Sequence, residues 1–178
     1  MVDKKKKNPL FFIVIGIVIF IFIGFALMSA SSFFFANKIN KTLKEKGVQY
    51  SAEDNSFTYK DKKGNSAEFG TSDKLPEGFP KDFPIYQGAK VVSSVTNTQQ
   101  GKGNELLVTF TIPAGQGLNK VVPFYKSGLN TSGWTITSSF DSDTIQTWAI
   151  TKGSTEGSVA ITSERDQMTI IVTLGEKE

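Results

Sequence analysis

The sequence contains no cysteine and no histidine. Without cysteine there is no disulfide framework and no thiolate to act as nucleophile or ligand. Without histidine the chain lacks the commonest general base and the commonest metal ligand. Arginine is almost missing as well, because Arg165 is the only arginine among 20 basic residues. These absences leave few routes to enzymatic chemistry.

A serine nucleophile in this chain would need lysine as its base, because nucleophilic catalysis requires an activating group. The two places where serine and lysine lie together do not have a suitable context. Ser72-Asp73-Lys74 falls in a linker, and Lys126-Ser127 falls on the exposed side of a predicted helix. We therefore expect a protein that is not an enzyme and uses no cofactor, and we predict no catalytic, cofactor-binding or metal-binding residue.

Three polar segments are candidate sites. Asp141-Ser142-Asp143 and Glu53-Asp54-Asn55 could supply oxygen ligands to Ca²⁺. The same residue types cap turns through side-chain hydrogen bonds, which is the interpretation we prefer for both. The loop 113–117 has the glycine content of a phosphate loop, but it lacks the third glycine and the lysine–hydroxyl pair. It is interpreted as a connection.

The positive charge is concentrated at the N-terminus. The net charge is +3, and Lys4–Lys7 stand against Asp3 alone. Removing these five residues from the 20 basic and 17 acidic side chains leaves 16 of each from residue 37 onward. Nucleic-acid binding depends on clustered cations, so we expect no nucleic-acid partner.

Residues 9–36 carry no charge and are rich in phenylalanine, isoleucine and valine. A helix of this length reaches about 42 Å, which is enough to cross a hydrocarbon core of roughly 30 Å. The apolar region of a cleaved signal peptide is shorter and ends in small residues, whereas the best cleavage position, after Ala30, has Met28 at a position that requires a small side chain. We therefore predict a retained transmembrane helix over 9–36 that contacts the lipid bilayer.

The orientation of this helix follows from its flanking lysines. Lys4–Lys7 lie directly beside it, and four more lysines lie in the segment 38–46 on its other side. The first cluster is less diluted by acidic residues, so the positive-inside rule favours a cytoplasmic tail over 1–8. The rest of the chain is then predicted to be extracytoplasmic in a single-pass protein of the cell membrane.

Residues 37–74 are predicted to form a juxtamembrane linker. Its first part, 37–46, has an apolar pair at helical spacing, and Gly47 would end that helix. The runs Ser56–Lys60 and Ser66–Phe69 flank turn residues, which predicts a β-hairpin. A hairpin alone is marginally stable, so it should dock on a neighbour or stay mobile.

Prolines recur every four residues in the segment 75–89, which keeps this segment extended. Its aromatic side chains make it too apolar for a solvated linker. It could be a proline-rich recognition site for a partner or a strap that packs its aromatic rings on the domain. The strap is the preferred interpretation, because buried aromatic residues usually serve packing.

Residues 75–178 are predicted to form an α+β domain. Alternating apolar residues indicate strands at 90–98, 105–112, 134–138, 143–152, 158–164 and 168–174, and a helix with an apolar stripe at 119–132 that ends at Gly133. The order ββαββββ predicts two layers, an antiparallel sheet with one helix packed on one face. The expected core is Val108, Phe110, Val121, Tyr125, Leu129, Trp134, Ile136, Trp148, Ile150, Val159, Ile161, Ile170 and Val172.

Two segments of this domain carry a family resemblance. DFPIYQGAKV at Asp82–Val91 contains P-x-Y-x-G-A, and PFYKSGLNTSGW at Pro123–Trp134 contains F-Y, leucine and G-W at a helix-to-strand junction. Over Leu75–Leu174 the chain resembles uncharacterised bacterial membrane-anchored or lipoprotein domains. The resemblance implies a fold and brings no known activity with it.

The function predicted from these observations is that of a membrane-anchored extracytoplasmic domain, a non-enzymatic binding module of the cell envelope. One face of the sheet would be free for an envelope protein or polymer. The alternative is a structural subunit that assembles through its N-terminal apolar helix.

Overall fold

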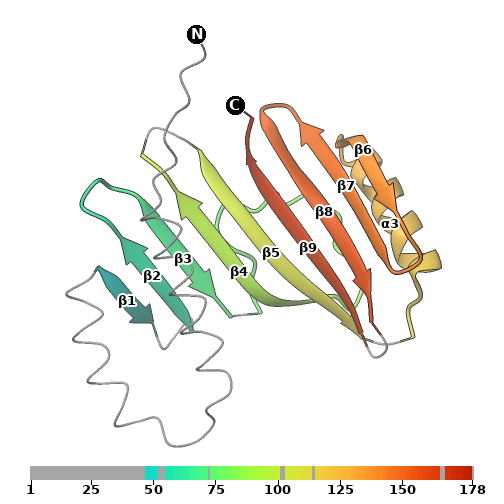
Figure 1. The fold of residues 1–178 in the computed structure, drawn as a ribbon, viewed down its shortest axis with the longest axis horizontal. Helices are drawn as coiled ribbons and strands as arrows, with labels where there is room; N and C mark the ends of the chain where they lie inside the picture. The colour runs from blue at the N-terminus through green and yellow to red at the C-terminus, as the bar shows by residue number, and fades with distance from the viewer. Residues whose placement is uncertain are drawn as a thin grey trace, which may run out of the picture. The chain divides into compact units, whose positions relative to one another are not determined.

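A computed structural model describes residues 47–51, 55–71, 73–100, 103–113, 115–164 and 167–177. These residues belong to one compact unit, Leu43–Glu178. They form a single antiparallel sheet of nine strands with one helix (Figure 1). The strands follow one another across the sheet in the order β1-β2-β3-β4-β5-β9-β8-β7-β6.

The bounds of the elements agree with the alternation in the sequence over most of the chain. The elements are β1 (Val48–Ser51), β2 (Ser56–Lys60), β3 (Ser66–Gly70), β4 (Lys90–Thr98), β5 (Asn104–Pro113), α3 (Leu118–Thr131), β6 (Thr135–Asp141), β7 (Ile145–Lys152), β8 (Thr155–Ser163) and β9 (Gln167–Glu176).

The predicted fold class is wrong about the extent of the sheet. The hairpin expected in the linker exists as β2 and β3, but β3 pairs with β4, with Gly70 opposite Ser94, so the hairpin continues the same sheet. A further strand that was not predicted, β1, pairs with β2. The unpaired backbone groups at the edge of β4 explain this arrangement, because an adjacent hairpin satisfies them.

The transmembrane helix predicted as part of this fold is not found among the residues that the structure describes. No helix in the described ranges is long and apolar enough to cross a membrane. The segment 9–36 to which it was assigned lies outside the described residues, as do the tail 1–8 and the helix predicted over 37–46.

Helix α3 is flanked by a glycine at each end, Gly117 before it and Gly133 after its C-cap Ser132. Gly117 is its N-cap, so the helix begins slightly earlier than the predicted start at 119. At the other end Gly133 has a φ of 79°, and the backbone N–H of Trp134 donates to the Leu129 carbonyl at 2.8 Å. The Gly133 N–H donates to the Asn130 carbonyl at 3.0 Å, which completes the Schellman pattern. The predicted helix stop at Gly133 is confirmed.

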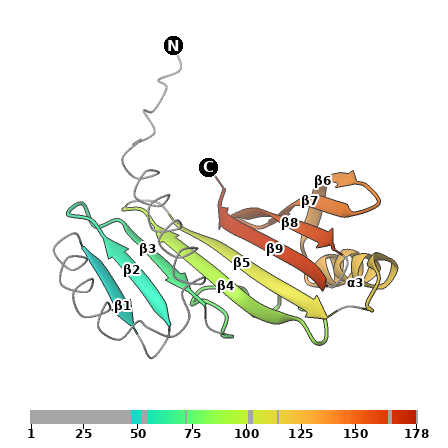
Figure 2. The same ribbon diagram turned by 60° about the horizontal axis from the view of Figure 1, so that its bottom comes forward.

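One face of the sheet carries the core. Helix α3 lies against this face near β6 (Figure 2) and buries Val121, Tyr125 and Leu129. Every expected core residue is buried except Ile136, which is partly buried. The core also contains members that were not on the expected list: Phe79, Phe83, Leu106, Ile112, Met168 and Leu174.

The segment 75–89 packs into this core, so its interpretation as a strap is confirmed. The ring of Phe83 meets Phe79 at 5.3 Å and Trp134 at 5.7 Å, both edge to face. Phe79 also meets Phe110 of β5 at 6.2 Å. Edge-to-face pairs of this kind add stability beyond the buried area. The strap therefore closes part of the core that helix α3 leaves open.

Trp134→Ala should lower the free energy of unfolding by about 3–5 kcal/mol, because it removes a large buried ring. Trp134 is 3% exposed and packs against Phe83 of the strap. Urea denaturation of the full-length chain measures the change. Phe140→Ala is the control, since Phe140 is 64% exposed and should change stability by less than about 0.5 kcal/mol. A loss below about 1 kcal/mol for Trp134→Ala would contradict its place in the core.

Candidate functional site

The strap follows helix α3 and is attached to the domain at successive residues. Asp82 forms an ion pair with Lys152 of β7. Pro84 packs directly on Gly128, where a Cβ atom would lie 2.7 Å from the proline Cβ. Glycine at this helical position therefore permits a close approach that another residue would obstruct.

Tyr86 is the next point of attachment. Its backbone N–H donates to the hydroxyl of Tyr125 at 3.4 Å, which is a long hydrogen bond. Tyr125 is 1% exposed, and burial raises the pKa of its hydroxyl to about 12, opposed by the hydrogen bond from Tyr86. Tyr125 is thus a neutral buried residue that links helix and strap.

A shallow hollow lies where the strap, helix α3 and the loop between β5 and α3 meet. Its volume is about 540 Å³, and it is lined by Tyr86, Gln87, Gln116 and Phe124. The rings of Tyr86 and Phe124 are 5.1 Å apart at 83°. The Tyr86 hydroxyl donates to Oε1 of Gln116 at 3.1 Å. Two aromatic rings and two amides therefore surround a space with no charged side chain in its lining.

This lining suits the binding of a small molecule without reaction. Ligand sites of a few hundred Å³ typically combine apolar or aromatic walls with a few polar groups. Gln87 and Gln116 supply amide donors and acceptors, and Phe124, which is 37% exposed, supplies an accessible ring. None of the four is a candidate nucleophile or an activated base.

The sequence did not identify this hollow. Glutamines in loops occur without any distinguishing pattern, and Tyr86 was interpreted only as a strap aromatic. The closest signal in the sequence was Phe124. It is a large aromatic residue on the predicted helix, but it lies outside the apolar stripe and so had no predicted packing partner. Its separation from Tyr86 in sequence conceals their contact.

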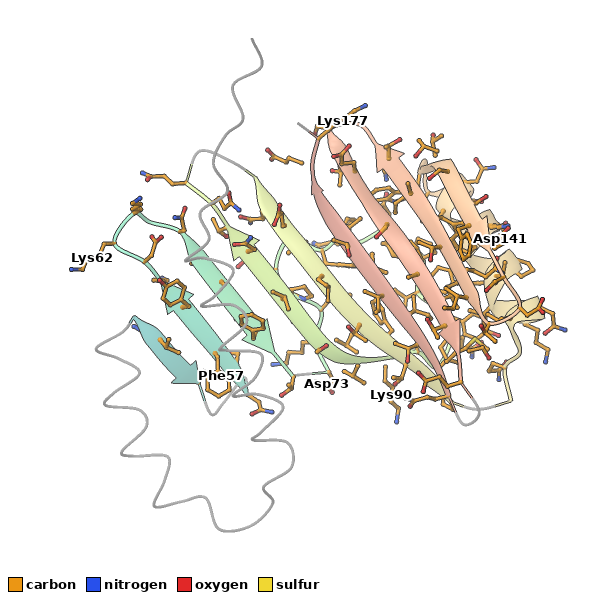
Figure 3. All side chains as sticks on the ribbon, in the orientation of Figure 1. Phe57, Lys62, Asp73, Lys90, Asp141 and Lys177 are labelled. Carbon is orange, nitrogen blue, oxygen red and sulfur yellow. The ribbon has the colours of Figure 1, made fainter. Side chains whose placement is uncertain are left out.

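The acidic segment Asp141-Ser142-Asp143 makes a turn in the structure. The Ser142 N–H donates to the Ile145 carbonyl at 2.8 Å, and the Ile145 N–H donates to the Ser142 hydroxyl at 3.1 Å. Asp141, labelled at the end of β6 in Figure 3, accepts from Lys126 at 3.5 Å and from the Trp148 indole at 3.4 Å. The turn interpretation is confirmed.

The remaining candidate segments are only partly described by the structure. Glu53, Asp54 and Ser72 lie outside the described residues. Gly117 connects the loop 113–117 directly to helix α3 as its N-cap. Within the ranges that the structure covers, no group of three or more acidic side chains could hold a metal ion.

Comparison with known proteins gives one finding. A family model described as START domain-like matches residues 91–169, which is less than half of the 178-residue chain. The match runs from β4 to the start of β9 and includes helix α3, but it leaves the strap outside. Searches of curated proteins and of solved structures gave no significant match.

Gly128→Ala should destabilise the protein by about 1–3 kcal/mol, because the new methyl group collides with Pro84. Alanine is otherwise favoured over glycine in a helix by about 1 kcal/mol. Urea denaturation measures the effect, with Ser127→Ala on the exposed side of the same helix as the control.

Combining Gly128→Ala with Pro84→Gly tests the cause of this effect. Removing the proline Cβ should relieve the collision, so the double variant should be more stable than the sum of the two single changes predicts. Additive effects would contradict a direct contact between the strap and Gly128.

The buried Tyr125 hydroxyl should make stability fall at high pH. Its folded-state pKa of about 12 lies above the ordinary value of 10.0, so the contribution is complete below pH 10 and is lost as pH rises from 10 to 12. The loss for this one group is about 2–3 kcal/mol. Comparing urea midpoints at pH 8 and pH 11.5 measures it, and Tyr125→Phe should lose less than the wild type. Equal losses in the two proteins would show that other groups cause the alkaline decline.

Proposed function

We propose that this chain is a non-enzymatic binding domain whose hollow between strap and helix takes a small neutral ligand. The observation that carries the proposal is the lining of that hollow, two aromatic rings and two amides without a charged group. The START domain-like match supports it, because that family description points to a ligand-binding domain.

The matched segment and the strap contribute different halves of the hollow. Gln116 and Phe124 lie within residues 91–169, whereas Tyr86 and Gln87 lie before them. In this proposal the strap completes the ligand site of the matched segment, so the residues of the strap contribute to the choice of ligand. The strap is held by Asp82–Lys152 and by the Tyr86 N–H bond to Tyr125, so it forms a fixed wall.

The proposal keeps the predicted place of action, the cell envelope. That placement rests on the resemblance over Leu75–Leu174 to bacterial membrane-anchored or lipoprotein domains. The ligand would then be a component of the envelope or a molecule that reaches it from outside.

A second candidate function uses the face of the sheet opposite helix α3. Along β5, β9, β8 and β7 the central outward positions carry no charge, while Lys62, Lys90 and Lys177 lie toward strand ends (Figure 3). These outward residues are Thr109, Thr111, Thr147, Ala149, Ser158, Ala160, Thr162, Thr169, Ile171 and Thr173. Charge depletion is typical of the centre of a protein interface. This face would then bind a protein or polymer partner.

Side-chain NMR of the full-length chain distinguishes the two candidates. Acetanilide, a neutral molecule with one ring and one amide, should shift the side-chain amide signals of Gln87 and Gln116. Phe124→Ala should abolish these shifts, because it removes the accessible ring, and Phe140→Ala on the other face should leave them unchanged. Shifts that instead spread over Ile171 and its neighbours would favour the sheet face and overturn the proposed hollow.

A further inference from the structure

The hydrogen bond inside the hollow determines which polar groups remain for a ligand. Tyr86 donates its hydroxyl proton to Oε1 of Gln116. The bond holds the Gln116 amide in place and leaves its NH₂ group as a donor, while the Tyr86 oxygen can still accept. Gln87 is exposed and offers both a donor and an acceptor. The hollow therefore presents one held N–H donor group, that of Gln116, together with the exposed Gln87 amide and the Tyr86 hydroxyl oxygen as an acceptor.

The complement of this arrangement is a ligand that carries an amide of its own. An amide offers one carbonyl, which can accept from the Gln116 NH₂, and one N–H, which can donate to Gln87 or to the Tyr86 oxygen. Charged ligands are disfavoured, because no lysine or carboxylate lines the hollow to pair with them. The exposed ring of Phe124 adds a surface on which a flat, C–H-bearing face of the ligand can pack. The C–H hydrogens carry a partial positive charge and are attracted to the negative face of the aromatic ring.

We propose that the hollow binds an N-acetylated amino sugar of an envelope polysaccharide. The acetamido group supplies the amide, its methyl group packs beside Phe124, and the C–H face of the sugar ring covers the aromatic wall. The inference rests on the proposed function and names the ligand class of that same site.

A peptide also carries amides, but the surroundings of the hollow favour the sugar. Extended peptides usually bind by adding to a strand edge, and helical ones need an apolar groove. The four lining residues come from the strap, a loop and helix α3, and none belongs to a strand. The volume of about 540 Å³ lies in the range of small-molecule sites.

Two soluble oligosaccharides test the acetamido group directly. Chitotetraose and cellotetraose share the same β-1,4 linkage and differ at C2, where the first carries an acetamido group and the second a hydroxyl. Titration calorimetry with the full-length chain should show chitotetraose binding at least about tenfold more tightly, the effect of one or two neutral hydrogen bonds.

Gln116→Glu tests the donor without removing the acceptor. The carboxylate can still accept from Tyr86, but it loses the NH₂ group, so chitotetraose affinity should fall by about tenfold or more. Phe124→Ala should weaken binding of both oligosaccharides. Gln49→Glu is the matched control, because Gln49 is exposed and lies on β1 at the far edge of the sheet, and it should leave both affinities unchanged.

The outcomes separate the ligand class from the site. Equal affinities for the two oligosaccharides, both lost in Phe124→Ala, would overturn the acetamido assignment and leave the hollow as a binding site. The acetamido sugar assignment would also be overturned, and the hollow kept as a binding site, if acetanilide or the peptide Ac-Ala-Ala-Ala-NH₂ binds in the hollow while chitotetraose does not. Chitotetraose binding that survives both Gln116→Glu and Phe124→Ala would overturn the assignment of this ligand to the hollow.

Discussion

The packing of the strap against helix α3 and the sheet is the contact on which the rest of the structure depends. The helix has 14 residues and is therefore about 21 Å long. The nine strands of the sheet, about 4.8 Å apart, span roughly 38 Å. A single helix of this size covers only part of one face. Phe79 and Phe83 of the strap supply the missing apolar cover over Phe110 and Trp134.

The edge of this core is closed by two similar arrangements of charge. Lys152 lies over the ring of Trp134 at 5.8 Å and pairs with Asp82, and Lys126 lies over Trp148 at 5.4 Å and pairs with Asp141. Each ammonium group gains from the negative face of an indole, and its carboxylate partner is about half exposed. Both tryptophans are almost fully buried. Lysine–aspartate pairs of this kind contribute little as surface ion pairs, so their effect lies mainly in covering the rings.

The candidate site is a consequence of the same contact. The strap packs closely on the helix where Pro84 meets Gly128. The hollow lies next along the strap, at Tyr86 and Gln87. One wall is positioned in advance, because Tyr86 is held through both its backbone and its hydroxyl. Preorganised walls reduce the entropy that a ligand must overcome on binding. In the proposed function, a neutral ligand would be recognised through shape and a few hydrogen bonds.

Local chemistry determined much of the fold from sequence alone. Strict alternation of apolar residues predicted β4, β5 and β9 within a few residues of their bounds, and Gly133 predicted the end of the helix. The turn residues Asp61–Asn65 predicted the β2–β3 hairpin, and the Asp61 carboxylate accepts from the N–H groups of Lys63 and Asn65 there. Each of these signals acts over a few neighbouring residues, so each can be read from a short segment.

Only the tertiary structure decided which strands are neighbours and where the hollow forms. The pairing of β3 with β4 and of β5 with β9 uses backbone hydrogen bonds, and every residue except proline carries the same backbone donor and acceptor. Alternation therefore assigns a side chain to a face without naming the partner strand. The hollow brings Tyr86 to Gln116 and Phe124 across about 30 residues or more of chain, a contact that depends on how strap, loop and helix pack together.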